Sequence, residues 1–242
     1  MSFQVGRVPG APYLYEMHQH TAGCSACAGA DPAKTVKALK AAGFTGMVLT
    51  NHFFRGNTGI NRRLEWVDFV RPYIAAYEAA KAAGEKLDFD VLFGLEEGVG
   101  GGKEVLLYGI TPAWVLAHPQ LRELRGDRES LERLCAMVHE GGGLVYQAHP
   151  FRVREYIADP WKPLPPEFLD GVEGYNACNS PVENARAVAF AREFDLPLVA
   201  GSDSHMADFR GRYGIACYHR IRTGQELAET LLEQDYELYI PD

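Results

Sequence analysis

Histidines and acids recur at short, fixed spacings along the sequence, and these residue types bind divalent cations. His18 and His20 are separated by one residue in the segment Glu-Met-His-Gln-His. Because side chains on a strand alternate between its faces, the two imidazoles point to the same side if the segment is extended. Two charged rings on one face repel each other unless a metal or a carboxylate compensates them. The spacing therefore predicts a pair of metal ligands.

Further candidate ligands share one property, which is that each follows a short apolar run that predicts a strand. They are His52, Glu96, His149, Asp203 and His205. Imidazole and carboxylate groups hold zinc, manganese or iron, and a carboxylate can bridge two ions. Seven such ligands, counted with the first pair, exceed what one tetrahedral ion needs. We therefore expect two or three divalent metal ions, with Glu97 as the alternative to Glu96.

The elements that must position these residues alternate between apolar strands and helices. Strands are expected near 12–18, 45–50, 88–95, 104–110, 143–148, 170–175, 197–201 and 214–219. Helices are expected over 31–42, 61–83, 128–140, 181–194 and 223–233. A βα repeat is typical of a largely parallel sheet wrapped by helices. In βα barrels the C-terminal strand ends converge on one mouth, so we expect the ligands to meet there.

The glycine-rich segment 98–103 resembles a phosphate-binding loop only superficially. It reads Gly-Val-Gly-Gly-Gly-Lys, but a strand and not a helix is expected to follow it. We therefore interpret it as a turn between two strands.

Composition narrows the class of protein. The chain has 242 residues of which 47% are hydrophobic, enough for one large core, so we expect a single domain over 1–242. It has no long apolar run and no signal-peptide layout, so we expect a soluble, cytoplasmic protein with no membrane partner. Its five cysteines are expected to be reduced. A net charge of -8 argues against binding long nucleic acid, but a small anionic substrate is compatible with bound cations.

Taken in order, the motifs resemble those of the PHP family, named for polymerase and histidinol phosphatase. They read His18-Gln19-His20, Asn51-His52, Gly94-Leu95-Glu96, His149-Pro150 and Gly201-Ser202-Asp203-Ser204-His205. The resemblance covers about residues 13–206. It implies an α/β fold, a distorted seven-stranded (β/α)7 TIM-like barrel, with up to three metals at the C-terminal strand ends. By that analogy one ion is held by His18, His20, Glu96 and Asp203, a second by Glu96 and His149, and a third by His52 and His205.

The sequence departs from the family pattern at three points. Asn51 stands where the family has an acid that is not generally a ligand. The segment after Glu96 lacks the histidine that would serve the second ion, so that site would be weak. The ligand that follows His-x-His would fall near Ala26, which cannot bind a metal. Cys24 and Cys27 flank that position, and Cys27 is either a substitute thiolate ligand or merely a nearby thiol.

Hydrolysis of a phosphate ester is the chemistry expected of such a cluster. A metal lowers the pKa of its bound water toward about 7 and so supplies hydroxide at neutral pH. Asp203 or a histidine such as His205 could accept the water's proton, which makes these two the catalytic candidates. Arg152 and Arg210 are expected to bind the phosphate, with a solvated loop arginine as the alternative. Asn176 is expected to line the pocket or else to stabilise a turn.

Three functions fit these observations. The favoured one is a metal-dependent phosphoesterase acting on a small phosphorylated metabolite or nucleotide. An exonuclease on short oligonucleotides is disfavoured by the negative charge but not excluded by it. A metal-binding accessory module with little activity is the reading that the missing ligands suggest. The sequence does not determine the substrate, the metal or the oligomeric state.

Overall fold

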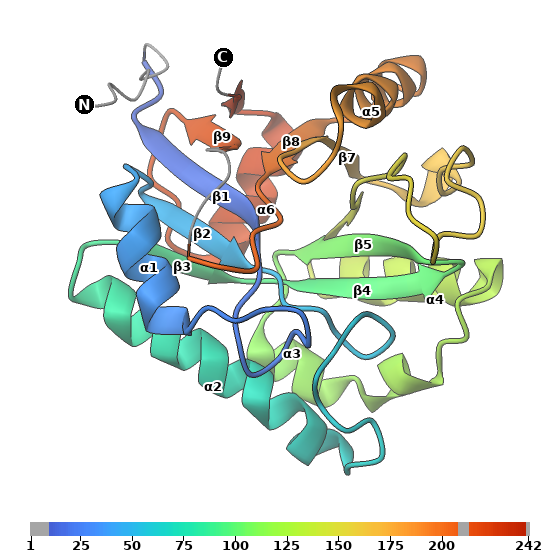
Figure 1. The fold of residues 1–242 in the computed structure, drawn as a ribbon, viewed down its shortest axis with the longest axis horizontal. Coiled ribbons are helices and arrows are strands. Elements are labelled where there is room, and N and C mark those ends of the chain that lie inside the picture. The colour runs from blue at the N-terminus through green and yellow to red at the C-terminus, as the bar shows by residue number, and fades with distance from the viewer. Residues whose placement is uncertain (1–9, 208–212, 241–242) are drawn as a thin grey trace.

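The structure, a computed structural model, describes residues 10–207 and 213–240. In this part of the chain ten strands form two five-stranded sheets, and six α-helices pack around them (Figure 1). None of the described helices is both long and apolar enough to cross a membrane.

The first sheet joins the N-terminal strands to the last two strands of the chain. Its strand order is β10-β9-β1-β2-β3. β1, β2 and β3 run parallel to one another, whereas β9 is antiparallel to both β1 and β10. The strands are β1 (Tyr13–Gln19), β2 (Gly46–Leu49), β3 (Asp90–Phe93), β9 (Gly214–Cys217) and β10 (Tyr236–Tyr239).

The second sheet has the order β4-β5-β6-β7-β8. β5 is antiparallel to both of its neighbours, β4 and β6, whereas β6, β7 and β8 run parallel to one another. The strands are β4 (Leu95–Gly100), β5 (Lys103–Tyr108), β6 (Leu144–Gln147), β7 (Gly171–Asn176) and β8 (Leu198–Gly201). Within the segment 98–103, Gly101 and Gly102 form the tight turn between β4 and β5, which confirms the interpretation of a turn between two strands.

Several helices begin at a residue whose side chain caps the first turn. Asp31 accepts a hydrogen bond from the backbone of Lys34 at the start of α1, and Ser180 and Thr223 form capping boxes at the starts of α5 and α6. The helices are α1 (Pro32–Ala41), α2 (Trp66–Glu85), α3 (Pro112–Ala117), α4 (Arg128–Glu140), α5 (Pro181–Glu193) and α6 (Gly224–Glu233). The short helix α3 and the strand β10 were not expected from the sequence.

The expected closed TIM-like barrel is wrong, because the described residues form two mixed sheets that do not close into one barrel. Two seams between the sheets explain this. Between β1 and β8 the pairing is reduced to one isolated bridge, Gln19 to Ser204. There the Glu16 carboxylate accepts from the backbone N–H groups of His18 and Ser202 and takes the place of a strand ladder.

The second seam lies where the expected strand 88–95 divides. The chain passes from β3 to β4 through Gly94, and it is the segment after β2 that pairs with β4, by one isolated bridge from His52 to Glu96. The β4–β5 and β5–β6 pairs are antiparallel, so the regular βα repeat is also broken here. These long-range features could not be read from local patterns.

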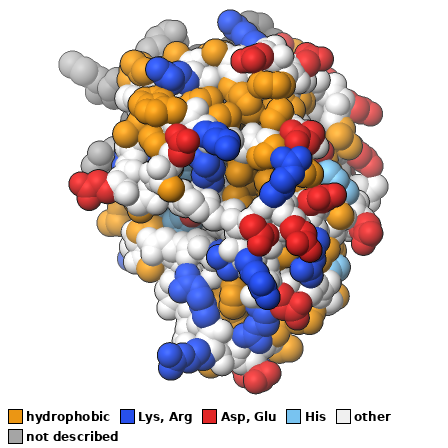
Figure 2. All heavy atoms as spheres, turned by 90° about the vertical axis from the view of Figure 1, so that its right-hand side faces the viewer, with side chains coloured by type: hydrophobic (Ala, Val, Ile, Leu, Met, Phe, Trp, Pro, Cys, Tyr) orange, Lys and Arg blue, Asp and Glu red, His pale blue; other side chains and the backbone are white. Residues whose placement is uncertain are grey.

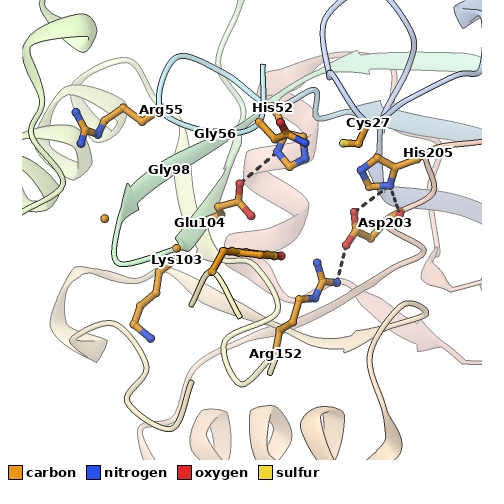
Figure 3. Close-up of a pocket in the computed structure, with 14 residues that line it drawn as sticks. Cys27, His52, Arg55, Gly56, Gly98, Lys103, Glu104, Arg152, Asp203 and His205 are labelled. Atoms are coloured by element: carbon orange, nitrogen blue, oxygen red, sulfur yellow. Dashed lines mark hydrogen bonds and ion pairs between the residues drawn. The ribbon is translucent and has the colours of Figure 1, made fainter. Parts of the chain in front are cut away.

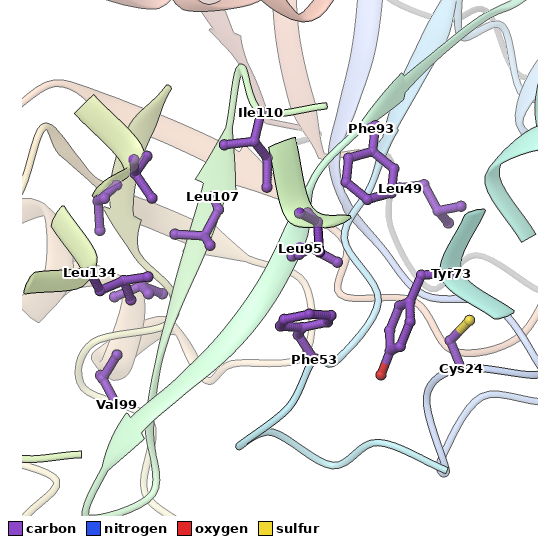
Figure 4. Packing of buried hydrophobic residues seen from close by; sticks show 14 of the residues in the cluster. Cys24, Leu49, Phe53, Tyr73, Phe93, Leu95, Val99, Leu107, Ile110 and Leu134 are labelled. Atoms are coloured by element: carbon purple, nitrogen blue, oxygen red, sulfur yellow. The ribbon is translucent and has the colours of Figure 1, made fainter. Parts of the chain in front are cut away.

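A large apolar cluster packs between the sheets and the helices (Figure 4). Phe53 is fully buried in it, and its ring makes edge contacts with Trp66, Phe69 and Tyr73. Truncating a buried aromatic residue of this kind costs about 3–5 kcal/mol. Because Phe53 directly follows His52, this packing also fixes the backbone that carries a candidate ligand.

Candidate metal centre

All seven predicted metal ligands converge at the two seams between the sheets. They come from the end of β1, the segment after β2, the start of β4, and the segments after β6 and β8. They are His18, His20, His52, Glu96, His149, Asp203 and His205, and each belongs to at least one group of potential ligand atoms lying within 4.8 Å of one another. The structure therefore brings together segments that lie far apart in the sequence.

Four side chains form a compact set around the β1–β8 seam. His18 Nε2 lies 3.0 Å from His20 Nε2, 3.3 Å from Glu96 Oε1 and 3.6 Å from Asp203 Oδ1. His20 Nε2 lies 3.2 Å from the same Asp203 oxygen. Ligand atoms held at about 2.0–2.2 Å from one tetrahedral ion are separated by roughly 3.3–3.6 Å. The set therefore fits a metal ion.

Glu96 extends the cluster toward two more histidines. Its Oε1 lies 3.0 Å from His149 Nε2, and its Oε2 lies 2.7 Å from His52 Nδ1. Glu96 Oε2 and His52 Nδ1 are nevertheless buried atoms without a well-formed hydrogen bond. Buried polar atoms are normally satisfied, and a cation that binds both of them would satisfy both.

His205 lies near His20 and His52 in a third group of potential ligands. The rings of His20 and His205 stack with centroids 4.3 Å apart. Figure 3 shows Cys27 beside His205 and His52. Cys27 is thus near the position of the missing family ligand, whereas Cys24 is buried in the apolar cluster.

Glu173 orients two of the candidate ligands from behind. Its Oε1 lies 2.9 Å from His18 Nδ1, and its Oε2 accepts from the His149 backbone N–H at 2.9 Å. Ser25 holds the Nδ1 atom of His20 in the same way, at 3.0 Å. Groups of this type fix the ring orientation of a metal-binding histidine and leave its other nitrogen for the ion.

The electrostatics of His20 and Asp203 suit cation binding. Burial lowers the pKa of His20 to about 3, with the neighbouring His52 adding to the effect, so the His20 imidazole is neutral. Burial would raise the pKa of Asp203, but Arg152 and His18 outweigh it and hold that pKa well below its usual range. A neutral imidazole and an ionised carboxylate are the forms that ligate metals.

A cavity of about 570 Å³ opens beside the cluster (Figure 3). Arg152 lines it and points at Asp203, with Nη2 2.6 Å from Oδ2. Two other basic residues at the cavity are turned away from it. The Arg55 guanidinium donates to the carbonyl groups of Leu124 and Arg125, and the Lys103 ammonium donates to that of Asp159.

The other predicted substrate-binding residues have different positions. Asn176 lies one layer behind the cavity, where its Oδ1 accepts from Arg152 and its Nδ2 donates to Glu173. Arg210 lies outside the described residues. Glu97, the alternative to Glu96, accepts from the backbone N–H of Arg55 on the opposite face of β4.

Sequence reasoning missed Glu104. Its carboxylate lies 3.3 Å from His52 Nδ1 and 3.6 Å from His149 Nε2, where the sequence offers no histidine. In the β4–β5 ladder Glu104 is opposite Gly98, two residues from Glu96, so both acids project from the same face. The register of a hairpin whose turn lies within 98–103 places the two carboxylates on one face, and this register is the signal that could have identified Glu104.

The comparisons with known proteins agree with the motifs. Residues 181–236 match the family model for PHP-associated sequences. No curated protein matches the chain significantly. The family match begins at α5 and ends at the first residue of β10, so it includes the candidate ligands Asp203 and His205.

Solved structures share the fold at low identity. A two-domain protein from Bacteroides vulgatus that contains a PHP-like metal-dependent phosphoesterase is 18% identical, with a TM-score of 0.65 over 98% of this chain and 67% of that chain. A protein from Bifidobacterium adolescentis assigned as a metal-dependent phosphoesterase is 17% identical, with a TM-score of 0.52 over 82% and 88%. An amidohydrolase from Chromobacterium violaceum is 16% identical, with a TM-score of 0.54 over 79% and 87%.

Proposed function

We propose that this protein is a PHP-type metal-dependent phosphoesterase that hydrolyses a small phosphorylated metabolite or nucleotide. The observation that carries the proposal is the convergence of the seven candidate ligands beside a cavity that presents Arg152. The cavity volume falls within the range of about 300–1,000 Å³ that is typical of small-molecule sites. The two neighbours assigned as phosphoesterases support the same reading.

The chain's own residues supply the ligands and the contacts to substrate. One ion would be held by His18, His20, Glu96 and Asp203, and further ions would be held by Glu96 with His149 and by His52 with His205. When bound, such ions lower the pKa of a water molecule and neutralise charge on phosphoryl oxygens.

Arg152 is placed to bind the phosphoryl group. Its Nη2 donates to Asn176 and Asp203, and its Nε donates to Asn179. A guanidinium has five N–H groups, so the two on Nη1 are left for a phosphoryl oxygen. The buried contacts hold the fork in a fixed orientation, which favours recognition of a tetrahedral anion.

Asp203 and His205 are the candidates for proton transfer. Asp203 is anionic and directs Oδ1 toward the histidine nitrogens, so it can accept a proton from the attacking water. His205 lines the cavity and keeps its Nδ1 2.8 Å from the Asp203 carbonyl oxygen. When His205 holds no ion, its other ring nitrogen can give a proton to the leaving oxygen.

Turnover of an aryl phosphate by the purified protein with manganese, zinc or iron tests the proposal. We expect metal-dependent hydrolysis that disappears in His20→Ala. Tight metal binding without turnover of any substrate on a broad panel would instead favour a metal-binding module.

Comparing a nucleotide monophosphate with a short single strand separates the phosphoesterase from an exonuclease. We expect the monophosphate to be the better substrate. On the face seen in Figure 2 basic side chains are interspersed with acidic ones, which does not favour binding of a long strand. A preference for the strand would overturn the assignment of a small substrate.

A further inference from the structure

Two carboxylates, Glu96 and Glu104, face the same pair of histidines. Glu96 places Oε1 3.0 Å from His149 Nε2 and Oε2 2.7 Å from His52 Nδ1. Glu104 places Oε1 3.3 Å from His52 Nδ1 and Oε2 3.6 Å from His149 Nε2. Each acid therefore spans both imidazoles, and each imidazole nitrogen lies between one oxygen of each acid.

Only one of these four contacts, that of Glu96 Oε1 with His149 Nε2, is a hydrogen bond. The Glu96 side chain is fully buried and that of Glu104 is 12% exposed, so two negative charges meet out of water. Such charges repel each other strongly unless cations lie between them. Glu96 Oε2 and His52 Nδ1 are both buried without a hydrogen bond of acceptable geometry, although they are 2.7 Å apart. A cation bound by both atoms would satisfy them after a small movement apart.

The backbone holds both acids in this position. Gly98 pairs with Glu104 in the β4–β5 ladder, and a Cβ atom on Gly98 would lie 2.6 Å from the Arg55 carbonyl oxygen. The hairpin therefore packs directly on the segment that follows His52. Gly56 leaves the space that the side chains need, since its Cβ would lie 3.3 Å from His52 and 3.4 Å from Glu104 Oε1.

We propose that Glu104 is a metal ligand and that it forms, with Glu96, a double carboxylate bridge between two cation positions. One position is completed by His52 and the other by His149. The inference rests on the proposed function only in requiring that the cluster binds metal. It assigns a ligand to the second metal site, for which this sequence lacks the histidine of the family motif. A site in which two carboxylates bridge the ions suits manganese or iron, as in carboxylate-bridged di-metal proteins.

Metal binding to the full chain tests the inference without reference to turnover. Protein stripped with a chelator is titrated with Mn²⁺, the bound ions are counted, and electron paramagnetic resonance records whether the ions are exchange-coupled. Glu104→Gln removes the charge at nearly constant shape, and Glu104→Asp keeps the charge but shortens the side chain. Glu155→Gln, at an exposed glutamate, is the matched control.

The wild type and Glu155→Gln are expected to show the spectrum of an exchange-coupled manganese pair. Glu104→Gln is expected to lose that spectrum and to bind fewer ions, with Glu104→Asp retaining part of the signal. An unchanged ion count and unchanged coupling in Glu104→Gln would overturn the inference. Circular dichroism shows whether each variant is folded, and if Glu104→Gln does not fold, the Glu104→Asp comparison decides.

The same samples separate this inference from the proposed function. A coupled pair that depends on Glu104, in a protein that hydrolyses no phosphate ester, would leave the ligand assignment standing and remove the phosphoesterase. Phosphoesterase activity together with uncoupled ions in the wild type would support the proposed function and overturn the assignment of Glu104 as a bridging ligand.

Discussion

Arg152 and Asp203 form a buried ion pair in which Nη2 lies 2.6 Å from Oδ2. The pair joins the loop after β6 to the segment after β8. In the proposed function it has two consequences, because it keeps Asp203 ionised and it aims the free edge of the guanidinium into the cavity. Asn176 contacts both partners and holds them in register.

Replacing Arg152 with lysine should reduce catalysis much more than folding. A lysine keeps the charge but loses the planar fork that contacts Asp203, Asn176 and Asn179 together. We expect kcat/KM for an aryl phosphate to fall by about 100-fold, equivalent to about 2.7 kcal/mol. Arg133→Lys on the exposed face of α4 is the control, and equal activity in both variants would refute the role of Arg152.

Glu173→Gln should weaken metal binding although Glu173 is not proposed as a ligand. The neutral amide no longer holds the His18 ring as an ionised carboxylate does, and it weakens the contact to the His149 backbone. Loss of such an orienting group typically costs about 10–100-fold in metal affinity. Calorimetric titration with Zn²⁺ or Mn²⁺ measures this effect, and Glu167→Gln at an exposed position should leave the affinity unchanged.

Gly201→Ala should disrupt the cluster by steric contact. A Cβ atom at this position would lie 2.5 Å from His18 Cβ and 2.9 Å from Glu173 Oε1. Overpacking of this kind costs about 1–3 kcal/mol in the free energy of unfolding and should also displace His18. Urea denaturation and metal titration measure the two effects. At Gly59 an added Cβ meets only ordinary contacts, so Gly59→Ala should change neither the free energy of unfolding nor the metal affinity.

The contribution of Glu183 to stability should disappear in acid. Burial opposes ionisation, but the backbone N–H groups of Ser180 and Val153 outweigh it and hold the pKa of Glu183 below its ordinary value. A lowered folded-state pKa stabilises the protein above the ordinary glutamate pKa of about 4.3, and this stabilisation is lost as the pH falls through the folded-state value.

Comparing the wild type with Glu183→Gln in urea at pH 6 and at successively lower pH checks this sign. The variant should be less stable at pH 6, and the difference should narrow below about pH 4. Glu129→Gln, in the exposed first turn of α4, controls for removal of a charge at a helix start. A gap that is constant or widens toward low pH would contradict the expectation.

Local sequence signals predicted many of the elements, together with a set of histidines and acids that the structure brings together. Helix α4 occupies the expected residues 128–140, because Asp127 caps it and glycine follows it. The strand-end histidines and acids were found because period-two alternation and strand ends can be read over a few residues. His52 and Glu96, 44 positions apart in the chain, nonetheless needed a long-range bridge to meet.

The features that were wrong or missed depend on contacts between distant segments. Barrel closure was expected from the family resemblance, but a buried Glu16 side chain occupies the place of a ladder at one seam. Glu104 was overlooked because a histidine was sought in its segment, whereas only the hairpin register shows that its carboxylate shares a face with Glu96. Arg210 lies outside the described residues and stays a prediction.

The position of the ligand cluster at the two seams gives it a role in holding the sheets together. Each seam has a single isolated bridge, Gln19 to Ser204 or His52 to Glu96, and each of these bridges includes or adjoins candidate ligands. Ions held there would link the two sheets at seams where only one isolated bridge joins them. Bound cations would then contribute to the stability of the contact between the sheets. Removing them with a chelator should increase amide hydrogen exchange first at the residues of these two seams.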